Sequence, residues 1–227
     1  MSVVDQIQSI NKELENTQAK LIAVSKTKPN KLIIEAYENG HRAFGENKVQ
    51  ELVDKAADLP KDIEWHMIGH LQRNKVKYIA PFVHLIHGVD TIKLLKEINK
   101  EGRKNDRVIP CLLQVHIAAE STKFGFSESE IEEFLKSGLL DEFKHVVIVG
   151  LMGMATNTPD QIQVRKEFAG LKSFFQTIKS EYNHPQLDFK EISMGMSGDY
   201  QMAVEEGSTM VRIGSTIFGA RNYANKE

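Results

Sequence analysis

The chain has 227 residues, of which 41% are hydrophobic and 26% are charged, so it can bury one large core and has the composition of an ordinary globular protein. Its formal net charge of -2 provides no basic footprint for nucleic acid, and its lysines are scattered along the chain. We therefore expect a single domain over residues 1–227 that has no nucleic-acid partner.

The N-terminal segment has apolar residues at helical spacing, at Val4, Ile7, Ile10 and Leu14. This spacing predicts a helix and differs from the continuous apolar centre of a signal peptide. No segment of the sequence approaches the length needed to span a membrane. Cys111 is the only cysteine, so intramolecular disulfides and thiolate metal clusters are excluded. These features favour the reducing cytoplasm, and the apolar run around Cys111 predicts a buried thiol.

Eight short apolar runs follow this helix, and amphipathic segments separate them. The strand-like runs are KLIAVS, RAFGE, EWHMIG, HLIHGV, VIPCLLQVHI, HVVIVGLMG, FKEISMG and TMVRIG. The helical segments are Asn30–Asn39, Lys48–Ala57, Arg73–Ala80, Thr91–Arg103, Ser127–Ser137, Pro159–Ser180 and Asp199–Glu206. This alternation, in a chain of this length, predicts an α/β fold, a single (β/α)8 TIM barrel with an extra N-terminal helix. An open, doubly wound sheet remains the alternative.

Lys26 follows directly after the first apolar run, which ends at Ser25. On its own, a lysine at the end of a strand is most simply explained as solvated. In a parallel barrel, however, the active site lies at the carboxyl ends of the strands, and strand one closes against strand eight. We therefore expect Lys26 and Arg212, from TMVRIGST, to be neighbours at one mouth of the barrel. Two cations placed so close normally require an anion or an acceptor between them.

The segments after the seventh and eighth runs, SMGMSGD and RIGSTIFGAR, favour anion binding. Glycine lets backbone N–H groups approach an oxyanion, serine hydroxyls donate hydrogen bonds, and a helix N-terminus adds its positive dipole end. Either loop alone is better explained by turns and by helix caps at Ser193, Ser197 and Ser215. The two loops together, facing Lys26, predict a phosphate site of the kind found after these strands in barrels.

A phosphate site, a nucleophilic lysine and an arginine between them predict a pocket for pyridoxal 5'-phosphate (PLP), held on Lys26 as an internal aldimine. The lysine must be deprotonated to attack the aldehyde, and a desolvated site beside another cation lowers its pKa toward that state. Arg212 would face the pyridine nitrogen and leave it unprotonated. This makes the cofactor a weaker electron sink than a carboxylate partner would.

Six segments, in this order over nearly the whole chain, closely resemble the family of pyridoxal phosphate homeostasis proteins. They are AVSKTKP, FGENKVQE, WHMIGHLQRNK, GLMGMAT, SMGMSGD and MVRIGSTIFGAR. The resemblance implies a fold type III PLP barrel, similar to the N-terminal domain of bacterial alanine racemase, with PLP as its cofactor.

The resemblance also implies roles for individual residues. It implies that Lys26 forms the aldimine, that Arg212 faces the pyridine nitrogen, that Ser197, Gly214 and Ser215 help hold the phosphate, and that Asn47 and Met196 line the pocket. Lys28 competes with Lys26, but Lys28 falls in the loop after the strand, whereas Lys26 follows the apolar run directly.

One position departs from the family pattern, because His116 stands where the usual QVNIA predicts asparagine. We interpret His116 as a packed polar side chain at the barrel mouth in preference to a proton donor. The neighbouring residues Thr122, Lys123, Phe124 and Gly125 otherwise follow the family.

We set aside three other groups of residues. His66 and His70 are spaced for zinc on a helix, but their segment is predicted to be a strand and no third ligand is obvious, so no metal site is expected. The methionines Met152, Met154, Met194 and Met196 are interpreted as core or pocket-wall residues. The polar residues Lys48, Gln50, Glu46, Glu51 and Asp54 are interpreted as a solvated helix face.

A bound cofactor does not by itself imply a reaction, because a racemase needs acid and base groups on both faces of the substrate carbon. Alanine racemases that resemble this barrel obtain the second base, a tyrosine, from a separate C-terminal domain. After the eighth apolar run, only a short helix and a polar tail remain before Glu227, so we expect no such domain here. Tyr200 and Tyr223 could intrude, but the sequence favours neither.

We therefore favour a non-catalytic protein that holds PLP reversibly, limits the free aldehyde and passes cofactor to apo-forms of PLP enzymes, as a monomer or weak dimer. The alternative is a PLP-dependent amino-acid racemase with low activity. A third hypothesis is a cofactor-free Schiff-base barrel, such as an aldolase acting on a phosphorylated sugar. Arg212 argues against that third hypothesis, because it suits a pyridine nitrogen better than a sugar hydroxyl.

Overall fold

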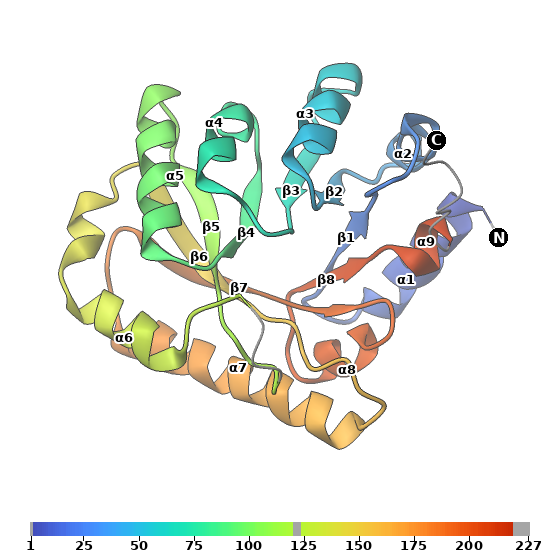
Figure 1. The fold of residues 1–227 in the computed structure, drawn as a ribbon. Coiled ribbons are helices and arrows are strands. Elements are labelled where there is room, and N and C mark those ends of the chain that lie inside the picture. The colour runs from blue at the N-terminus through green and yellow to red at the C-terminus, as the bar shows by residue number, and fades with distance from the viewer. Residues whose placement is uncertain (1, 120–123, 220–227) are drawn as a thin grey trace.

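The computed structural model describes residues 2–119 and 124–219 of the chain. Eight parallel strands close into a barrel in chain order, with β1 paired to both β2 and β8 (Figure 1). The strands are β1 Lys20–Val24, β2 Ala43–Glu46, β3 Glu64–Met67, β4 Leu85–Val89, β5 Ile109–Gln114, β6 Val146–Met152, β7 Leu187–Met196 and β8 Met210–Ile213. The predicted barrel is confirmed, and the doubly wound alternative is wrong.

The α-helices lie outside the barrel (Figure 1). They are α1 Val3–Leu14, α2 Asn30–Glu38, α3 Val49–Asp58, α4 Val76–Ile79, α5 Ile92–Lys104, α6 Glu128–Lys136, α7 Gln161–Glu181, α8 Tyr200–Glu205 and α9 Ser215–Phe218. Short 3-10 helices, η1 Arg73–Lys75 and η2 Leu139–Glu142, precede α4 and β6 respectively. The extra N-terminal helix expected from the sequence is α1, and its predicted apolar residues Ile7, Ile10 and Leu14 are buried.

Local sequence explains where several helices begin. Ser2 and Asp5 form a reciprocal capping box at the start of α1, and Ser127 and Glu130 do the same for α6. At the start of α7 the Asp160 side chain accepts hydrogen bonds from the N–H groups of the first turn. These caps satisfy backbone donors that have no partner within the helix, so each helix starts at a defined residue.

The larger apolar core lies between the barrel and its helices, as the alternation of apolar faces predicts. A smaller cluster fills the inside of the barrel and contains Ile22, Leu85, Leu112, Val149, Met152 and Met210. Val149 and Met152 both belong to this cluster although strict strand alternation would place them on opposite faces. A register shift in β6 explains this, because Gly150 adopts φ +148 and a Cβ there would lie 1.8 Å from the carbonyl oxygen of Glu191.

Polar side chains also lie inside the barrel. His66 Nδ1 lies 2.8 Å from His87 Nε2, and His87 Nδ1 lies 2.8 Å from Ser193 Oγ. Ser193 Oγ in turn accepts a hydrogen bond of 2.5 Å from Arg212. We call these four residues the interior chain. Because all four are buried, their hydrogen bonds to one another replace those that water would otherwise provide.

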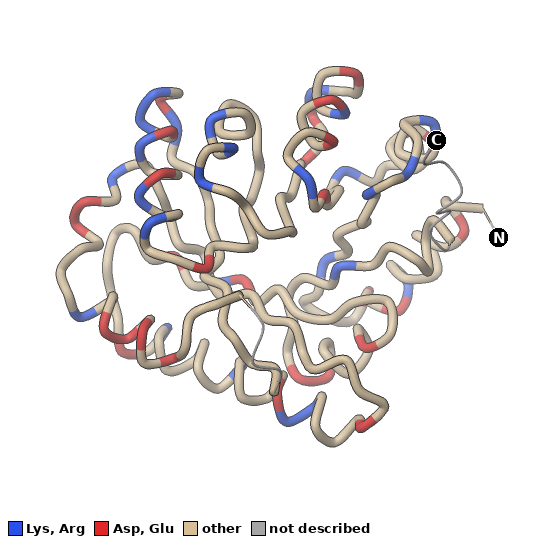
Figure 2. The backbone as a smooth tube through the Cα atoms, in the orientation of Figure 1, with Lys and Arg blue, Asp and Glu red and all other residues tan. Residues whose placement is uncertain are grey.

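Charges of both signs alternate along the outer helices, as α3 and α5 show in Figure 2. Within residues 2–119 and 124–219, no helix combines the length and the apolar character needed to cross a bilayer. Cys111 is buried in β5, which confirms the predicted buried thiol, and burial raises the pKa of this thiol well above the usual range.

The interior chain makes the fold sensitive to acid. Burial lowers the pKa of His66 to about 3 and that of His87 well below its usual 6.5. Below that usual value the unfolded chain binds protons that the folded chain does not. Stability is therefore fully present above about pH 6.5 and is lost as the pH falls, by about 1.4 kcal/mol per pH unit for each histidine.

We expect His87→Gln to reduce the slope of unfolding free energy against pH by about 1.4 kcal/mol per pH unit between roughly pH 6 and 5, measured by urea unfolding. His184→Gln is the matched control, because His184 is half-buried beside Asp141 and lies outside the interior chain. Equal slopes for wild type and His87→Gln would contradict the neutral, buried state of His87.

Candidate functional site

A pocket of about 300 Å³ lies at the carboxyl ends of the barrel strands. Its lining contains all the residues that the sequence predicted for the site: Lys26, Asn47, Met196, Ser197, Arg212, Gly214 and Ser215. The remaining lining residues are Val24, Lys28, Ile68, Met154, Gly198 and Gly219. These residues lie at or beyond the ends of β1, β2, β3, β6, β7 and β8, so the closure of the barrel brings segments far apart in the chain to one place.

Arg212 lies deep in this pocket, with only 4% of its surface exposed. One terminal nitrogen donates to Ser193 Oγ at 2.5 Å, and the other donates to the carbonyl oxygen of Gly153 at 3.1 Å. Burial lowers the pKa of Arg212 to about 10, so the guanidinium is still charged at neutral pH. The pocket therefore contains a cation in a fixed orientation. Ser193, read from the sequence as a helix cap or a loop donor, lies instead in β7 inside the barrel.

The two lysines of the first loop differ in their contacts. The Lys28 ammonium donates to the carbonyl oxygens of Phe218 and Gly219, at 2.8 and 3.0 Å, so it connects the loop after β1 to the end of α9. Lys26 is half-buried at the pocket, one residue after Ser25 at the end of the buried strand. The Lys28 ammonium therefore has a structural role at α9, and Lys26 is the lysine that directly follows the buried strand end at the pocket.

The backbone around Lys26 forms a tight turn. The N–H of Lys28 donates to the carbonyl oxygen of Ser25 at 3.0 Å, and Thr27 adopts a left-handed conformation with φ 63. That conformation is costly for a β-branched residue. It is held because the N–H of Thr27 donates to Glu51 Oε1 at 2.5 Å. The strained turn sets the direction in which Lys26 leaves the strand.

A buried ion cluster supports this turn from below. Lys55 Nζ lies 2.8 Å from Glu46 Oε1, 2.7 Å from Glu51 Oε1 and 2.8 Å from the carbonyl oxygen of Ser25. Ser25 Oγ donates to the same Glu46 oxygen at 2.6 Å. Burial raises the pKa of Glu46, while the Lys55 ammonium and the Ser25 hydroxyl oppose that rise. These contacts fix the end of β1 against α3.

The interpretation of Glu46 and Glu51 as part of a solvated helix face was wrong. Glu46 is fully buried at the end of β2, and Glu51 is paired with the buried Lys55 on the first turns of α3. The four-residue spacing of Glu51 and Lys55 is the one sequence signal for this cluster. That spacing is equally common on solvated helices, so it did not reveal the burial.

Two loops meet on the side of the pocket where the sequence predicted phosphate binding. The N–H of Gly214 donates to Ser197 Oγ at 3.2 Å, which joins the loop after β7 to the turn before α9. Gly195 adopts φ +92, and a Cβ there would lie 2.6 Å from the Cβ of Ala203. Ser215 begins α9, whose first N–H groups precede the first intrahelical hydrogen bond. Hydroxyl and N–H donors are therefore concentrated here.

The methionines divide as the sequence analysis predicted. Met152 and Met194 are buried in the core, whereas Met154 and Met196 line the pocket, and Met196 is 40% exposed. The backbone of Asn47 packs closely against Gly69. A Cβ added to Gly69 would lie 2.5 Å from the Asn47 carbonyl oxygen.

Other candidate residues lie elsewhere. The backbone N–H of His116 donates to Phe126, and His116 is not among the residues that line the pocket. Tyr200 donates its hydroxyl to Glu13 on α1 at 2.6 Å. Tyr223, Thr122 and Lys123 lie outside the described residues. A larger hollow of about 750 Å³ lies over the loops after β3 and β4, where His70 is paired with Asp90.

Comparison with known proteins places the chain in a family. Residues 2–222 match the family described as alanine racemase, N-terminal domain. The chain is 40% identical to a pyridoxal phosphate homeostasis protein of Vibrio alginolyticus over 90% of this chain and 88% of the relative. It is 38% identical to the human protein of that name over 95% of this chain and 81% of the relative. The chain therefore belongs to the pyridoxal phosphate homeostasis protein family.

Solved structures agree with this assignment. PipY of Synechococcus elongatus, in a structure with PLP bound, is 34% identical and superposes with a TM-score of 0.86 over 96% of this chain and 100% of that chain. Alanine racemase of Bartonella henselae is 16% identical, with a TM-score of 0.75 over 96% of this chain and 60% of that chain. The second similarity shows a shared barrel fold.

We expect Lys55→Met to destabilise the protein by about 3 to 5 kcal/mol, because it leaves the buried Glu46 carboxylate without its cation. The double variant Lys55→Met, Glu46→Gln should recover part of that loss, since it removes the uncompensated charge. Urea unfolding measures both. A loss below about 1 kcal/mol for Lys55→Met would show that the cluster behaves like an exposed ion pair.

Proposed function

We propose that this protein binds PLP in the 300 Å³ pocket, with Lys26 as the covalent anchor, and acts in intracellular PLP homeostasis without catalytic turnover. The observation that carries the proposal is the convergence of an amine, a buried guanidinium and a group of hydroxyl and N–H donors on one pocket. These groups match an aldehyde, a pyridine nitrogen and a phosphate respectively. The family name and the PLP-bound PipY structure support the same cofactor.

The residues of the pocket fit PLP by their chemistry. When bound, PLP supplies a reactive aldehyde and an electron-withdrawing ring. Lys26 would hold that aldehyde as the covalent anchor. Ser197, Ser215 and the N–H groups near Gly214 would donate to the phosphate, and Asn47 and Met196 would form walls. Gly198, where an added Cβ would meet open space, leaves room at this side of the pocket.

Arg212 is the residue that argues most directly for low reactivity. It keeps its charge at neutral pH and its two terminal nitrogens are held by Ser193 and Gly153, so it can only donate toward the pyridine nitrogen. A ring nitrogen that accepts from a guanidinium stays unprotonated. The cofactor then withdraws electrons weakly, which suits storage of PLP better than carbanion chemistry.

The lining of the pocket supports the same conclusion. Among the described residues that line it, Lys26 and Lys28 are the only candidates for proton transfer, and no tyrosine, histidine or carboxylate side chain is present. The Lys28 ammonium donates to two backbone carbonyls. Racemisation requires acid and base groups on both faces of the substrate carbon, and Lys26 serves one face only.

The rest of the proposal concerns the setting of this pocket. We infer that residues 1–227 act as a single PLP-binding domain in the cytoplasm, as a monomer or a weak dimer, and pass cofactor to apo-forms of PLP enzymes. The half-buried Lys26 and the exposed Met196 support exchange, because they place the anchor near solvent.

We expect the purified protein, loaded with PLP, to show a visible absorption band that borohydride reduction converts into a stable adduct on the peptide containing Lys26. Lys26→Ala should lose the adduct, whereas Lys28→Ala should keep it, because Lys28 lies in the same pocket but holds backbone carbonyls. Absorption spectra and peptide mass spectrometry measure both. An adduct on Lys28 would overturn the assignment of Lys26 as the anchor. No adduct after PLP is added would overturn PLP binding and favour a sugar-phosphate barrel.

We expect the PLP-loaded protein to exchange the α-hydrogen of amino acids for deuterium in D₂O no faster than the Lys26→Ala variant does. Proton NMR of several L- and D-amino acids measures the exchange, and a bacterial alanine racemase provides the positive control. Rapid exchange that depends on Lys26 would establish the racemase alternative in place of the homeostasis role.

A further inference from the structure

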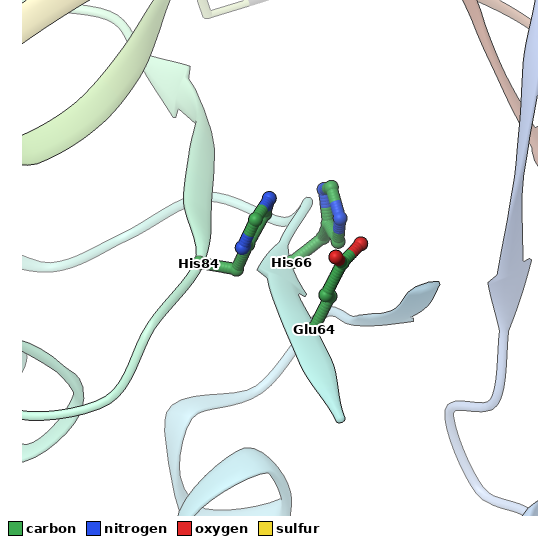
Figure 3. Close-up of side chains that lie close together, drawn as sticks. All are labelled: Glu64, His66 and His84. Atoms are coloured by element: carbon green, nitrogen blue, oxygen red, sulfur yellow. The ribbon is translucent and has the colours of Figure 1, made fainter. Parts of the chain in front are cut away.

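A second group of chemically active side chains lies at the opposite end of the barrel, at the amino ends of β3 and β4. Glu64, His66 and His84 each place one ring nitrogen or carboxylate oxygen so that all three atoms lie within 4.8 Å of one another. Figure 3 shows the Glu64 and His66 side chains extending from β3 and the His84 side chain extending from the residue before β4, toward one region. The PLP pocket contains none of these residues.

His66 has one nitrogen with an unmet bonding capacity. Its Nδ1 atom is 2.8 Å from His87 Nε2, so Nε2 is the nitrogen left to bind another group. That Nε2 atom is buried and has no hydrogen-bond partner among the described residues. An unpartnered nitrogen in a side chain that is 2% exposed costs stability unless something outside the protein chain binds it.

The chemical state of His66 suits a metal ligand. Its Nδ1 faces His87 Nε2, and its buried Nε2 has no hydrogen-bond partner among the described residues, so Nε2 can offer a lone pair to an ion. Histidine ligands usually donate their other ring N–H to a protein acceptor, which fixes the ring. His87 fills this role, because its Nε2 can accept from His66 Nδ1–H while its Nδ1–H donates to Ser193.

Glu64 and His84 supply the exposed part of the group. Both are anchored by the backbone, since the N–H of Glu64 donates to Arg42 and the N–H of His84 donates to Trp65. Their side chains can therefore move toward an ion that enters from solvent while the strands stay in place. The nearby Lys20 is paired with Glu191 at 3.4 Å, which partly neutralises its charge.

We propose that Glu64, His66 and His84 bind a divalent transition-metal ion of the zinc class at the amino end of the barrel. Two imidazoles and one carboxylate form a donor set suited to Zn²⁺ and related ions and poorly suited to Ca²⁺ or Mg²⁺, which prefer oxygen ligands. Water completes the coordination on the solvent side. This site shares no residue with the PLP pocket.

The sequence alone did not reveal this group. The zinc pair suggested by spacing, His66 and His70, does not form, because His70 lies in the loop after β3, where it is paired with Asp90 and stacked on Phe124. His66 lies instead beside Glu64, the first residue of its own strand β3, and beside His84, the residue before β4.

The test uses the untagged full-length protein and Zn²⁺ alone, titrated by calorimetry and by competition with a chromophoric zinc indicator. We expect one Zn²⁺ per chain, with affinity reduced about tenfold or more in His84→Gln and in Glu64→Gln. Both residues are exposed, so these variants should fold normally. His184→Gln is the control, because His184 also lies beside a carboxylate, Asp141, but without a third ligand in reach among the described residues.

A crystal soaked in Zn²⁺ supplies the second readout, because anomalous scattering at the zinc edge locates the ion. A peak between Glu64, His66 and His84 supports the proposal. A peak elsewhere, a wild-type protein that takes up no Zn²⁺, or unchanged affinity in His84→Gln and Glu64→Gln would overturn it. Repeating the titration with Lys26→Ala separates the two sites, since loss of PLP attachment should leave Zn²⁺ affinity unchanged.

Discussion

The guanidinium of Arg212 is a permanent cation inside a closed barrel, and protein oxygens must satisfy it there. Ser193 and Gly153 accept its hydrogen bonds, from β7 and from the residue that follows β6. These contacts orient the guanidinium at the bottom of the pocket and hold three neighbouring strand ends together. Both the polarity of the pocket and the arrangement of the side chains beneath it follow from the need to satisfy this one buried charge.

A second buried charge shapes the other side of the pocket. Lys55 compensates Glu46 and at the same time binds the carbonyl oxygen of Ser25, the last residue before Lys26. Glu51, from the same cluster, accepts the N–H of Thr27 and stabilises its left-handed backbone. Lys26 therefore leaves a strand end whose backbone is held by these contacts, and its own side chain is half-buried at the pocket.

The barrel was predictable because its evidence is local. Each apolar run and each amphipathic segment carries its own period, and their alternation specifies the topology without any knowledge of contacts. Lys26, Arg212 and the two glycine-containing loops were predictable for a related reason, since the closure of β1 on β8 brings known strand ends together. Sequence position alone was sufficient for these residues.

The contacts that support the site could not be predicted in this way. His87 and Ser193 are 106 residues apart in the chain, and their contact depends on which side chains of β4 and β7 point inward at the same level. The irregular register of β6 and β7 makes this level hard to predict from the sequence. An extra residue in a strand reverses which of the following side chains point inward. Glu46 was misread for a similar reason, since its burial depends on a lysine two turns into the next helix.

The single hydroxyl hydrogen of Ser193 connects the two ends of the barrel. Ser193 Oγ accepts from Arg212, so its hydrogen can be directed at His87 Nδ1 or away from it. In the first case His87 Nδ1 accepts from Ser193, and His87 Nε2–H donates to His66 Nδ1. His66 then carries its hydrogen on the unpartnered Nε2. In the second case His66 keeps its hydrogen on Nδ1 and offers a lone pair at Nε2. A cation at the amino end selects the second arrangement, so Ser193 then receives hydrogen bonds from both His87 and Arg212.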